Sequence, residues 1–197
     1  MQRNWMMFVD GENFTIRGQE VASRDGVKLK AGEYWQKDVF LWLPGIEPRR
    51  GYFGGSALWQ GVNDYAVRAH YYTSVSGDDQ LVASTREALK TLGFHPEVFK
   101  KPSGQKSKGV DIALTTNMLA HAFRNNYDVA WLVAGDGDYA PLVEEVKREG
   151  KIVNLAFFSH GLSPALRLSA DTLYDLTGYF QERWSHLQLE AERAAKA

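Results

Sequence analysis

The sequence predicts an α/β protein with a central, mainly parallel sheet and helices on both of its faces. Apolar and β-branched runs of strand length recur along the chain, and segments with a helical period separate most of them. These runs are almost continuously hydrophobic, which is typical of strands that are buried on both faces of a parallel sheet. Apolar residues at 44% and charged residues at 24% are ordinary for a globular domain.

Five apolar runs are the main predicted strands. They are WMMFV (5–9), AVRAHYYTSV (66–75), HPEVF (95–99), VAWLVA (129–134) and IVNLAFF (152–158). A short sixth strand is expected at TLYDL (172–176). In open sheets of this class, ligands bind at the carboxyl ends of the strands where the strand order reverses. The residues that follow each strand are therefore the first place to look for a site.

The predicted helices have recognisable ends. Segment 78–93 starts with two acids and ends at a glycine, as a capped helix does. Segment 139–150 has a proline in its first turn and also ends at a glycine. Further helices are expected around Asp111, near 163–169, and from about 178 onward.

The segment from about 18 to 65 interrupts this alternation. It is rich in Gly and Pro, contains three tryptophans and has no clean period. We interpret it as an insertion within one domain of residues 1–178, which a C-terminal helix and tail (179–197) follow. Its aromatic residues are expected to form a core or a homodimer contact, although their mixture with basic residues is also a pattern that stacks single-stranded bases.

Composition excludes several kinds of chemistry. The absence of cysteine rules out disulfides and thiolate catalysis, so oxygen or imidazole ligands must hold any metal. A net charge of −1 rules out a broad electrostatic attraction to nucleic acid, so phosphate binding must be local. No apolar run approaches the length of a membrane span, and an acid follows the first residues too soon for a signal peptide. We expect a cytoplasmic protein.

Aspartates follow two of the predicted strands. Asp10 comes after the first strand, Asp136 and Asp138 come after the fourth, and Asp111 starts the helix before the fourth. Two carboxylates 4 Å apart repel each other by about 4 kcal/mol at an effective dielectric constant of 20, so protons or a hard cation must offset a cluster. Carboxylates suit one or two Mg²⁺ or Mn²⁺ ions, which activate water and neutralise phosphate. We predict that these four aspartates form a metal site for phosphodiester hydrolysis.

Simpler roles for the same residues stay open. Asp138 could be an N-cap, and Asp111 could be a favourable acid in a first helical turn. Asp10 could be the nucleophile of a phosphatase. Asn13, three residues later, could orient a ligand or cap a helix. The GDG loop lacks the third glycine of a dinucleotide fingerprint, so nucleotide-cofactor binding is not indicated.

Four lysines precede the helix of Asp111. They are Lys100, Lys101, Lys106 and Lys108. Such lysines could flank the acidic site and pair with the phosphates of a substrate, and a solvated loop is the alternative. Lys108 and Asn13 are the candidates for orienting the substrate.

Three blocks of the sequence resemble the NYN domain, in its LabA-like branch formerly labelled DUF88, within the PIN-like nuclease superfamily. The blocks are FVDGENF, KGVDIAL and LVAGDGDYAPLVEEVKREGK, and the resemblance covers about residues 5–16 and 66–178. It implies a PIN-like three-layer sandwich whose acidic site binds Mg²⁺ or Mn²⁺ to cut single-stranded or structured RNA. By this resemblance, the metal ligands are Asp10, Asp111, Asp136 and Asp138.

One position departs from the family pattern. Many relatives have an aspartate where this chain has Asn117. Six residues from Asp111 corresponds to about 600° around a helix, so Asn117 is expected to point about 120° away from it. A metal-dependent ribonuclease is thus the leading hypothesis. The alternatives are a non-catalytic RNA- or partner-binding module that keeps a remnant acidic site, and an aspartate-based phosphatase.

Overall fold

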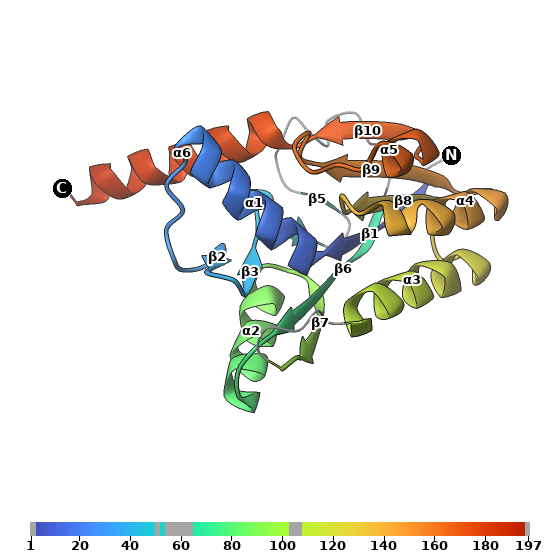
Figure 1. Ribbon diagram of the computed structural model, residues 1–197, viewed down its shortest axis with the longest axis horizontal. Helices are drawn as coiled ribbons and strands as arrows, with labels where there is room; N and C mark the ends of the chain where they lie inside the picture. Colours follow the sequence, from blue (N-terminus) through green and yellow to red (C-terminus); the bar gives the residue numbers. More distant parts are fainter. Residues whose placement is uncertain (1–2, 50–51, 54–64, 103–107, 196–197) are drawn as a thin grey trace.

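A six-stranded sheet forms the centre of the protein (Figure 1). The computed structural model describes residues 3–49, 52–53, 65–102 and 108–195. All neighbouring strands in the sheet are parallel, in the order β10-β9-β8-β1-β6-β7. The strands are β1 (Asn4–Asp10), β6 (Tyr65–Val75), β7 (His95–Lys100), β8 (Val129–Val133), β9 (Ile152–Phe157) and β10 (Thr172–Asp175). The predicted parallel α/β sheet is confirmed.

The strand order reverses beside β1. From β1 the chain moves outward to β6 and β7, and then returns to β8 on the other side of β1. Val9 pairs with Val133 of β8 and with Tyr71 of β6, so β1 lies between them up to its last residues. The carboxyl ends of β1 and β8 are therefore adjacent, at the kind of switch point where α/β sheets bind ligands.

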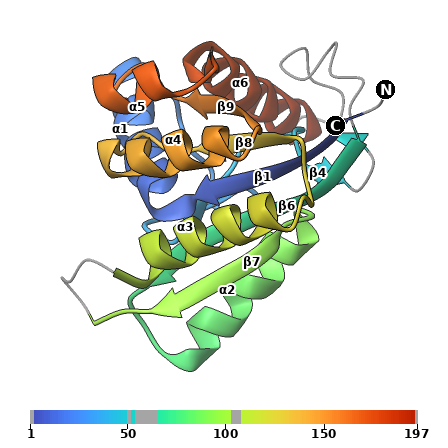
Figure 2. The same ribbon diagram turned by 90° about the vertical axis from the view of Figure 1, so that its right-hand side faces the viewer.

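Helices cover both faces of the sheet and give three layers. The helices are α1 (Gly11–Asp25), α2 (Asp79–Thr91), α3 (Lys108–Phe123), α4 (Ala140–Arg148), α5 (Pro164–Ser169) and α6 (Thr177–Ala194). Alternate side chains of β1 point to opposite faces of the sheet. Met7 and Val9 pack against α1, α2 and α6 on one face. Met6 and Phe8 pack against α3, α4 and α5 on the other face. Figures 1 and 2 show α1 and α2 across the sheet from α3, which lies over β1 and β6. This arrangement is the expected sandwich.

Helix α1 continues to Asp25, so it extends into the segment at 18–65 that we interpreted as an insertion. The helix ends at Gly26, whose φ of 70° is the left-handed conformation common after a helix. In the middle of α1, a Cβ on Gly18 would lie 2.1 Å from Leu41 Cδ2, so close packing requires the glycine. Glycine weakens the propensity of a sequence to form a helix, which explains why this helix gave no clear signal.

Much of the same segment belongs to the core. Two hairpins follow α1, formed by β2 (Trp35–Gln36) with β3 (Phe40–Leu41) and by β4 (Pro48–Arg49) with β5 (Tyr52–Phe53). Phe40 and Trp42 are buried, and the Trp42 ring packs edge-on against Phe94 with centroids 4.8 Å apart. The core interpretation is correct for these two aromatics. Trp59 lies outside the described residues.

The C-terminal helix α6 packs Phe180 and Trp184 into the core layer that contains α1. Its far end extends beyond the body of the domain (Figure 1). None of the helices in the described part of the chain has both the length and the apolar character needed to cross a membrane.

Candidate metal centre

Asp10 is both the last residue of β1 and the N-cap of α1. Its Oδ1 accepts a hydrogen bond from the backbone N–H of Asn13 at 3.0 Å, and the side chain is almost completely buried. Burial raises the pKa of Asp10 to about 7, against the lowering effect of its hydrogen bonds from Asn13 and Tyr139. The charges of Asp111 and Glu12 raise it further. An ionised carboxylate in this position needs a positive partner.

The hydroxyl of Tyr139 connects Asp10 to Asp111. Its oxygen lies 3.0 Å from Asp10 Oδ2 and 3.0 Å from Asp111 Oδ1. A phenol has one proton and can donate to only one carboxylate at a time. The carboxyl group that does not receive this proton makes a favourable contact with the Tyr139 oxygen only when it is itself protonated and donates a hydrogen bond. The two carboxyl groups and the phenol thus form one unit whose protonation is shared.

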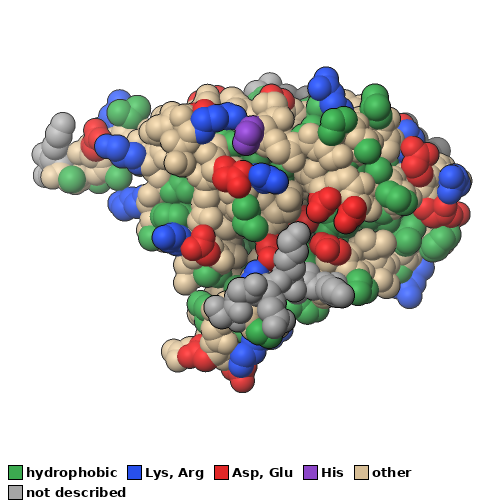
Figure 3. Space-filling view, viewed as in Figure 1, with side chains coloured by type: hydrophobic (Ala, Val, Ile, Leu, Met, Phe, Trp, Pro, Cys, Tyr) green, Lys and Arg blue, Asp and Glu red, His purple; other side chains and the backbone are tan. Residues whose placement is uncertain are grey.

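Helix α3 brings Asp111 to the edge of the sheet at which β1 ends. Burial raises the pKa of Asp111, the hydrogen bond from Tyr139 opposes this rise, and the charges of Asp136, Glu12 and Asp138 increase it. Acidic side chains gather on this face of the molecule, near the first turns of α1 and α3 (Figure 3). The aspartates that the sequence singled out therefore act on each other electrostatically.

Asn13 fixes the loop that follows β8. Its side-chain Oδ1 accepts a hydrogen bond from the backbone N–H of Gly135 at 3.0 Å, which ties the start of α1 to this loop. Asp136 then caps the short 3₁₀ helix η2 (Gly137–Tyr139) by accepting from the N–H of Asp138 at 3.1 Å. Both Asp136 and Asp138 are exposed. The capping role considered for Asp138 belongs to Asp136, and Asn13 positions the backbone of the loop.

Glu12 is a member of this site that sequence reasoning missed. Its Oε1 lies 2.5 Å from Lys101 Nζ, in an ion pair whose side chains are only 20% and 19% exposed. The other carboxylate oxygen accepts a hydrogen bond from the Ser74 hydroxyl. Lys101, expected to pair with substrate phosphate, is thus engaged with Glu12. Its place in the sequence, two residues after Asp10 and in the first turn of a helix, could have indicated that Glu12 lies near the site.

The remaining predicted lysines divide into two groups. Lys100 forms a solvent-exposed ion pair with Asp79 at 2.8 Å. Lys106 and the side chain of Lys108 lie outside the described residues, so the orienting role of Lys108 stays a prediction.

Asn117 faces away from the aspartates, as its spacing predicted. Its Nδ2 donates to Glu97 Oε1 at 2.6 Å and to the Tyr72 hydroxyl at 3.2 Å. These partners lie on β7 and β6, so the amide belongs to a separate polar contact between α3 and the sheet. Neither of these hydrogen bonds involves Asp10 or Asp111.

Sequence comparison identifies the family of this domain. The model of the NYN domain matches residues 4–177, which is most of the chain. The chain belongs to the NYN domain family. This is a PIN-like nuclease family, so the resemblance found in the sequence blocks is confirmed. No curated protein matches the chain.

The fold of this NYN domain is similar to that in a crystal structure of a protein of unknown function from Vibrio parahaemolyticus. The TM-score is 0.58 at 22% sequence identity, and the match covers 89% of this chain and 93% of that chain. At this identity the likeness supports the shared fold and does not extend to activity.

Two carboxylates of the NYN domain are suitable ligands for a hard divalent cation. Among the described residues, no three histidine, aspartate or glutamate side chains are grouped closely enough to hold a metal ion, so the four-aspartate site stays a prediction. Mg²⁺ commonly uses only one or two protein carboxylates and completes its shell with water and substrate phosphate. Asp10, whose burial disfavours its charge, and Asp111, joined to it through Tyr139, supply such a pair.

Proposed function

We propose that this NYN domain is a metal-dependent ribonuclease that hydrolyses RNA phosphodiester bonds. The observation that carries the proposal is the unit formed by Asp10, Tyr139 and Asp111 at the switch point of the sheet. Burying one carboxylate beside another is unfavourable, and such an arrangement persists where it serves to bind a cation or a proton. Family membership supports the choice of nuclease chemistry.

Asp10 and Asp111 would hold Mg²⁺ or Mn²⁺, and Asp136 and Asp138 would line the approach to it. When bound, such an ion supplies a Lewis acid for the phosphate oxygens and lowers the pKa of water. The exposed positions of Asp136 and Asp138, close enough to affect the pKa of Asp111, suit them to contact waters or a second ion.

The chain's own residues fix the geometry of this site. Asp10 cannot rotate freely, because one of its oxygens caps α1 and the other accepts from Tyr139. Asn13 holds the loop of Asp136 through the N–H of Gly135. Lys101 compensates the charge of Glu12, which keeps the summed negative charge lower where a polyanionic substrate must approach. Hydrolysis would form a P–O bond to the water oxygen and break the P–O bond to a ribose oxygen. A carboxylate of this site would accept the proton that the water loses, and the departing ribose oxygen would take up a proton.

Cleavage of end-labelled RNA tests the proposal. Wild-type protein and the Asp111→Asn variant are incubated with single-stranded RNA, duplex RNA and single-stranded DNA, each with Mg²⁺, Mn²⁺ or EDTA. We expect RNA cleavage that requires the metal and falls at least 100-fold in the variant, a loss typical of removing a transition-state interaction. Circular dichroism should show the same fold for both proteins. Intact RNA in every lane would overturn the assignment.

A second function is favoured by one observation. Asn117 occupies a position where the family resemblance implies an aspartate, so one acidic group of the family pattern is missing from this chain. A non-catalytic binding module would retain RNA equally in Mg²⁺ and in EDTA and would form no product. The same experiment, with RNA retention measured beside cleavage, separates the two functions.

A further inference from the structure

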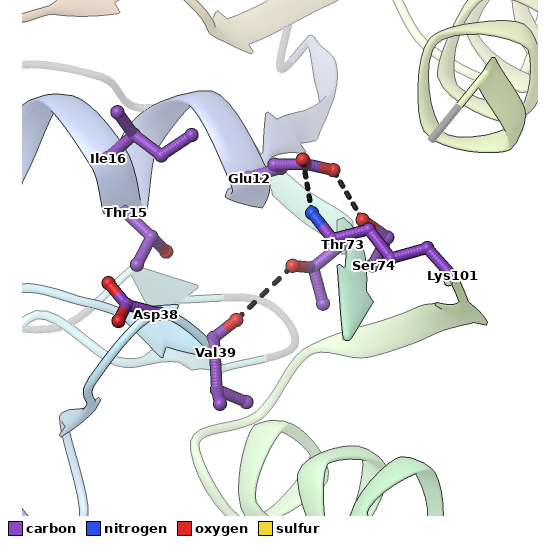
Figure 4. Close-up of a pocket in the computed structure, with 8 residues that line it drawn as sticks. All are labelled: Glu12, Thr15, Ile16, Asp38, Val39, Thr73, Ser74 and Lys101. Carbon is purple, nitrogen blue, oxygen red and sulfur yellow. Dashed lines mark hydrogen bonds and ion pairs between the residues drawn. The ribbon is translucent and has the colours of Figure 1, made fainter. Parts of the chain in front are cut away.

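A cavity of about 250 Å³ lies beside the first turns of α1, and Glu12 is one of its lining residues (Figure 4). Glu12 and Lys101 form one end of the cavity, and Asp38 lies at the other end (Figure 4). Glu12 lies two residues after Asp10 in the first turn of α1, so the cavity adjoins the proposed catalytic centre.

The side walls of the cavity present mainly carbon to its interior. The lining includes Ile16, whose side chain is 47% exposed, and Val39. Two threonine hydroxyls in the walls are already used, because Thr15 donates to the Gly11 carbonyl at 2.6 Å and Thr73 donates to the Val39 carbonyl at 3.3 Å. Such walls favour a flat, largely apolar group over a strongly hydrated one.

Two hydrogen bonds with Gln19 hold Asp38 at the edge of the cavity. Gln19 Nε2 donates to Asp38 Oδ1 at 3.0 Å, and Gln19 Oε1 accepts from the backbone N–H of Asp38 at 3.1 Å. Asp38 also has a φ of 59°, in the left-handed region that few residues other than Gly, Asn and Asp adopt readily. Among the described residues, none donates a hydrogen bond to its second carboxylate oxygen. The Asp38 carboxylate is therefore held in place at the edge of the cavity, and its second oxygen can still accept hydrogen bonds from a ligand.

We propose that this cavity binds one unpaired nucleobase of the RNA strand, next to the phosphate that is cleaved, and that Asp38 selects guanine. The proposal rests on the proposed ribonuclease function. The volume lies below the roughly 300–1,000 Å³ of sites for larger ligands, so it suits one base better than a dinucleotide. The base would lie against Ile16 while its polar edge meets Asp38.

Hydrogen-bond chemistry explains the preference for guanine. The N1–H and N2–H groups of guanine are adjacent donors, and the two oxygens of a carboxylate can accept both. Uracil presents carbonyl oxygens on both sides of its one N–H, and these oxygens would face the negative charge of Asp38. In a duplex, the donor edge of guanine is occupied by its partner, so only an unpaired base can bind in this way.

Nucleotide binding in the absence of metal tests the proposal separately from catalysis. The full chain is titrated with 5′-GMP and with 5′-UMP in EDTA, and backbone amide shifts are followed by NMR. We expect GMP to bind about tenfold more tightly than UMP, with shifts in residues that line the cavity, since a good pair of base contacts discriminates by about this factor or more. Equal affinities, or shifts confined to other surfaces, would overturn the proposal.

Three variants sharpen the test. Asp38→Asn keeps a residue type that tolerates the left-handed conformation, and it should remove the preference for GMP while the thermal melting temperature stays unchanged. Ile16→Trp should fill the cavity and weaken both nucleotides. Leu189→Trp introduces the same large ring on α6 at a side chain of similar exposure, 53% against 47%, and should change neither affinity. Retention of the GMP preference in Asp38→Asn would refute the role of Asp38.

The two proposals fail in distinguishable ways. Selective GMP binding without metal-dependent RNA cleavage would remove the nuclease assignment and keep the base site. Metal-dependent cleavage with no nucleotide selectivity, and equal rates on strands with guanine or uracil at every position, would keep the nuclease and remove the base site.

Discussion

The hydroxyl of Tyr139 and the carboxylate of Asp10, 129 residues apart in the sequence, lie 3.0 Å from each other in the core of the domain. The same hydroxyl lies 3.0 Å from Asp111. One proton cannot satisfy two ionised carboxylates, so without a cation at least one of the three groups must adjust its protonation. Binding of a divalent ion would neutralise the charge of the two carboxylates, so that both could stay ionised beside the single Tyr139 proton.

Removal of the Tyr139 hydroxyl should weaken metal binding and catalysis without unfolding the domain. In Tyr139→Phe, Asp10 loses a hydrogen bond that lowers its pKa, so its proton is held more tightly and competes better with the metal. We expect RNA cleavage to fall about 10- to 100-fold and the Mn²⁺ requirement to shift to higher concentration. Metal titrations of the cleavage rate at pH 7 give both quantities.

Tyr127→Phe is the matched control for this change. Tyr127 is also a buried tyrosine of the same core layer, and its hydroxyl donates to the Met118 carbonyl at 2.9 Å, away from the aspartates. This variant should lose about 1 kcal/mol of stability and keep its metal dependence. An equal loss of cleavage in both variants would show that Tyr139 acts only through packing.

The stability of the metal-free protein should depend on pH through Asp10. Its pKa is about 7 in the folded chain against an ordinary value of 3.8, so the folded state binds the proton more tightly than the unfolded state does. The contribution of Asp10 is therefore fully favourable below about pH 3.8, and it is lost as the pH rises to about 7, by up to about 1.4 kcal/mol per pH unit.

Asp10→Asn isolates this effect, because asparagine caps helices about as well as aspartate and cannot ionise. In urea unfolding with EDTA, the variant should gain stability relative to wild type as the pH rises from 4 to 8. A difference in unfolding free energy that stays constant over this range would mean that Asp10 ionises normally in the folded protein.

Loss of Lys101 should affect metal and RNA in opposite directions. Lys101→Met leaves Glu12 without its cation, so the site becomes more negative, Mn²⁺ binds severalfold more tightly and RNA binds severalfold more weakly. Stability should fall by on the order of 1–2 kcal/mol, less than the 3–5 kcal/mol for breaking a fully buried pair, since both side chains keep some exposure to solvent. Calorimetry with Mn²⁺ and filter binding with RNA measure the two affinities.

Lys100→Met is the control, since it removes the same charge from the neighbouring position. The ion pair of Lys100 with Asp79 has side chains that are 54% and 91% exposed, and such surface pairs contribute little. It should leave Mn²⁺ affinity and stability nearly unchanged. Identical shifts in both variants would indicate a general effect of net charge.

The sequence predicted the sheet and the edge at which the candidate site lies. Strand-length apolar runs are a local signal, and the parallel order places Asp10 and the loop after β8 side by side. The helix that follows β1 was missed, because Gly18 reduces its local propensity while its packing against Leu41 depends on residues 23 positions away.

Contacts within the site were harder to predict than its position. Tyr139 follows the GDGD motif and looks like an ordinary core aromatic, and its role depends on two aspartates from distant elements. Glu12 and Lys101 are 89 residues apart, and no local pattern indicates that they form an ion pair. These contacts arise from tertiary packing, for which spacing along the chain carries no signal.

Manganese binding followed by electron paramagnetic resonance tests the central claim most directly, because bound and free Mn²⁺ give separate signals. Wild-type protein and Asp10→Asn are titrated at pH 8, where Asp10 of the wild type has lost its proton. We predict stoichiometric binding of one or two ions to wild type and at least tenfold weaker binding to the variant. Equal binding by the two proteins, or none by the wild type, would contradict the assignment of Asp10 and Asp111 as the metal-holding pair.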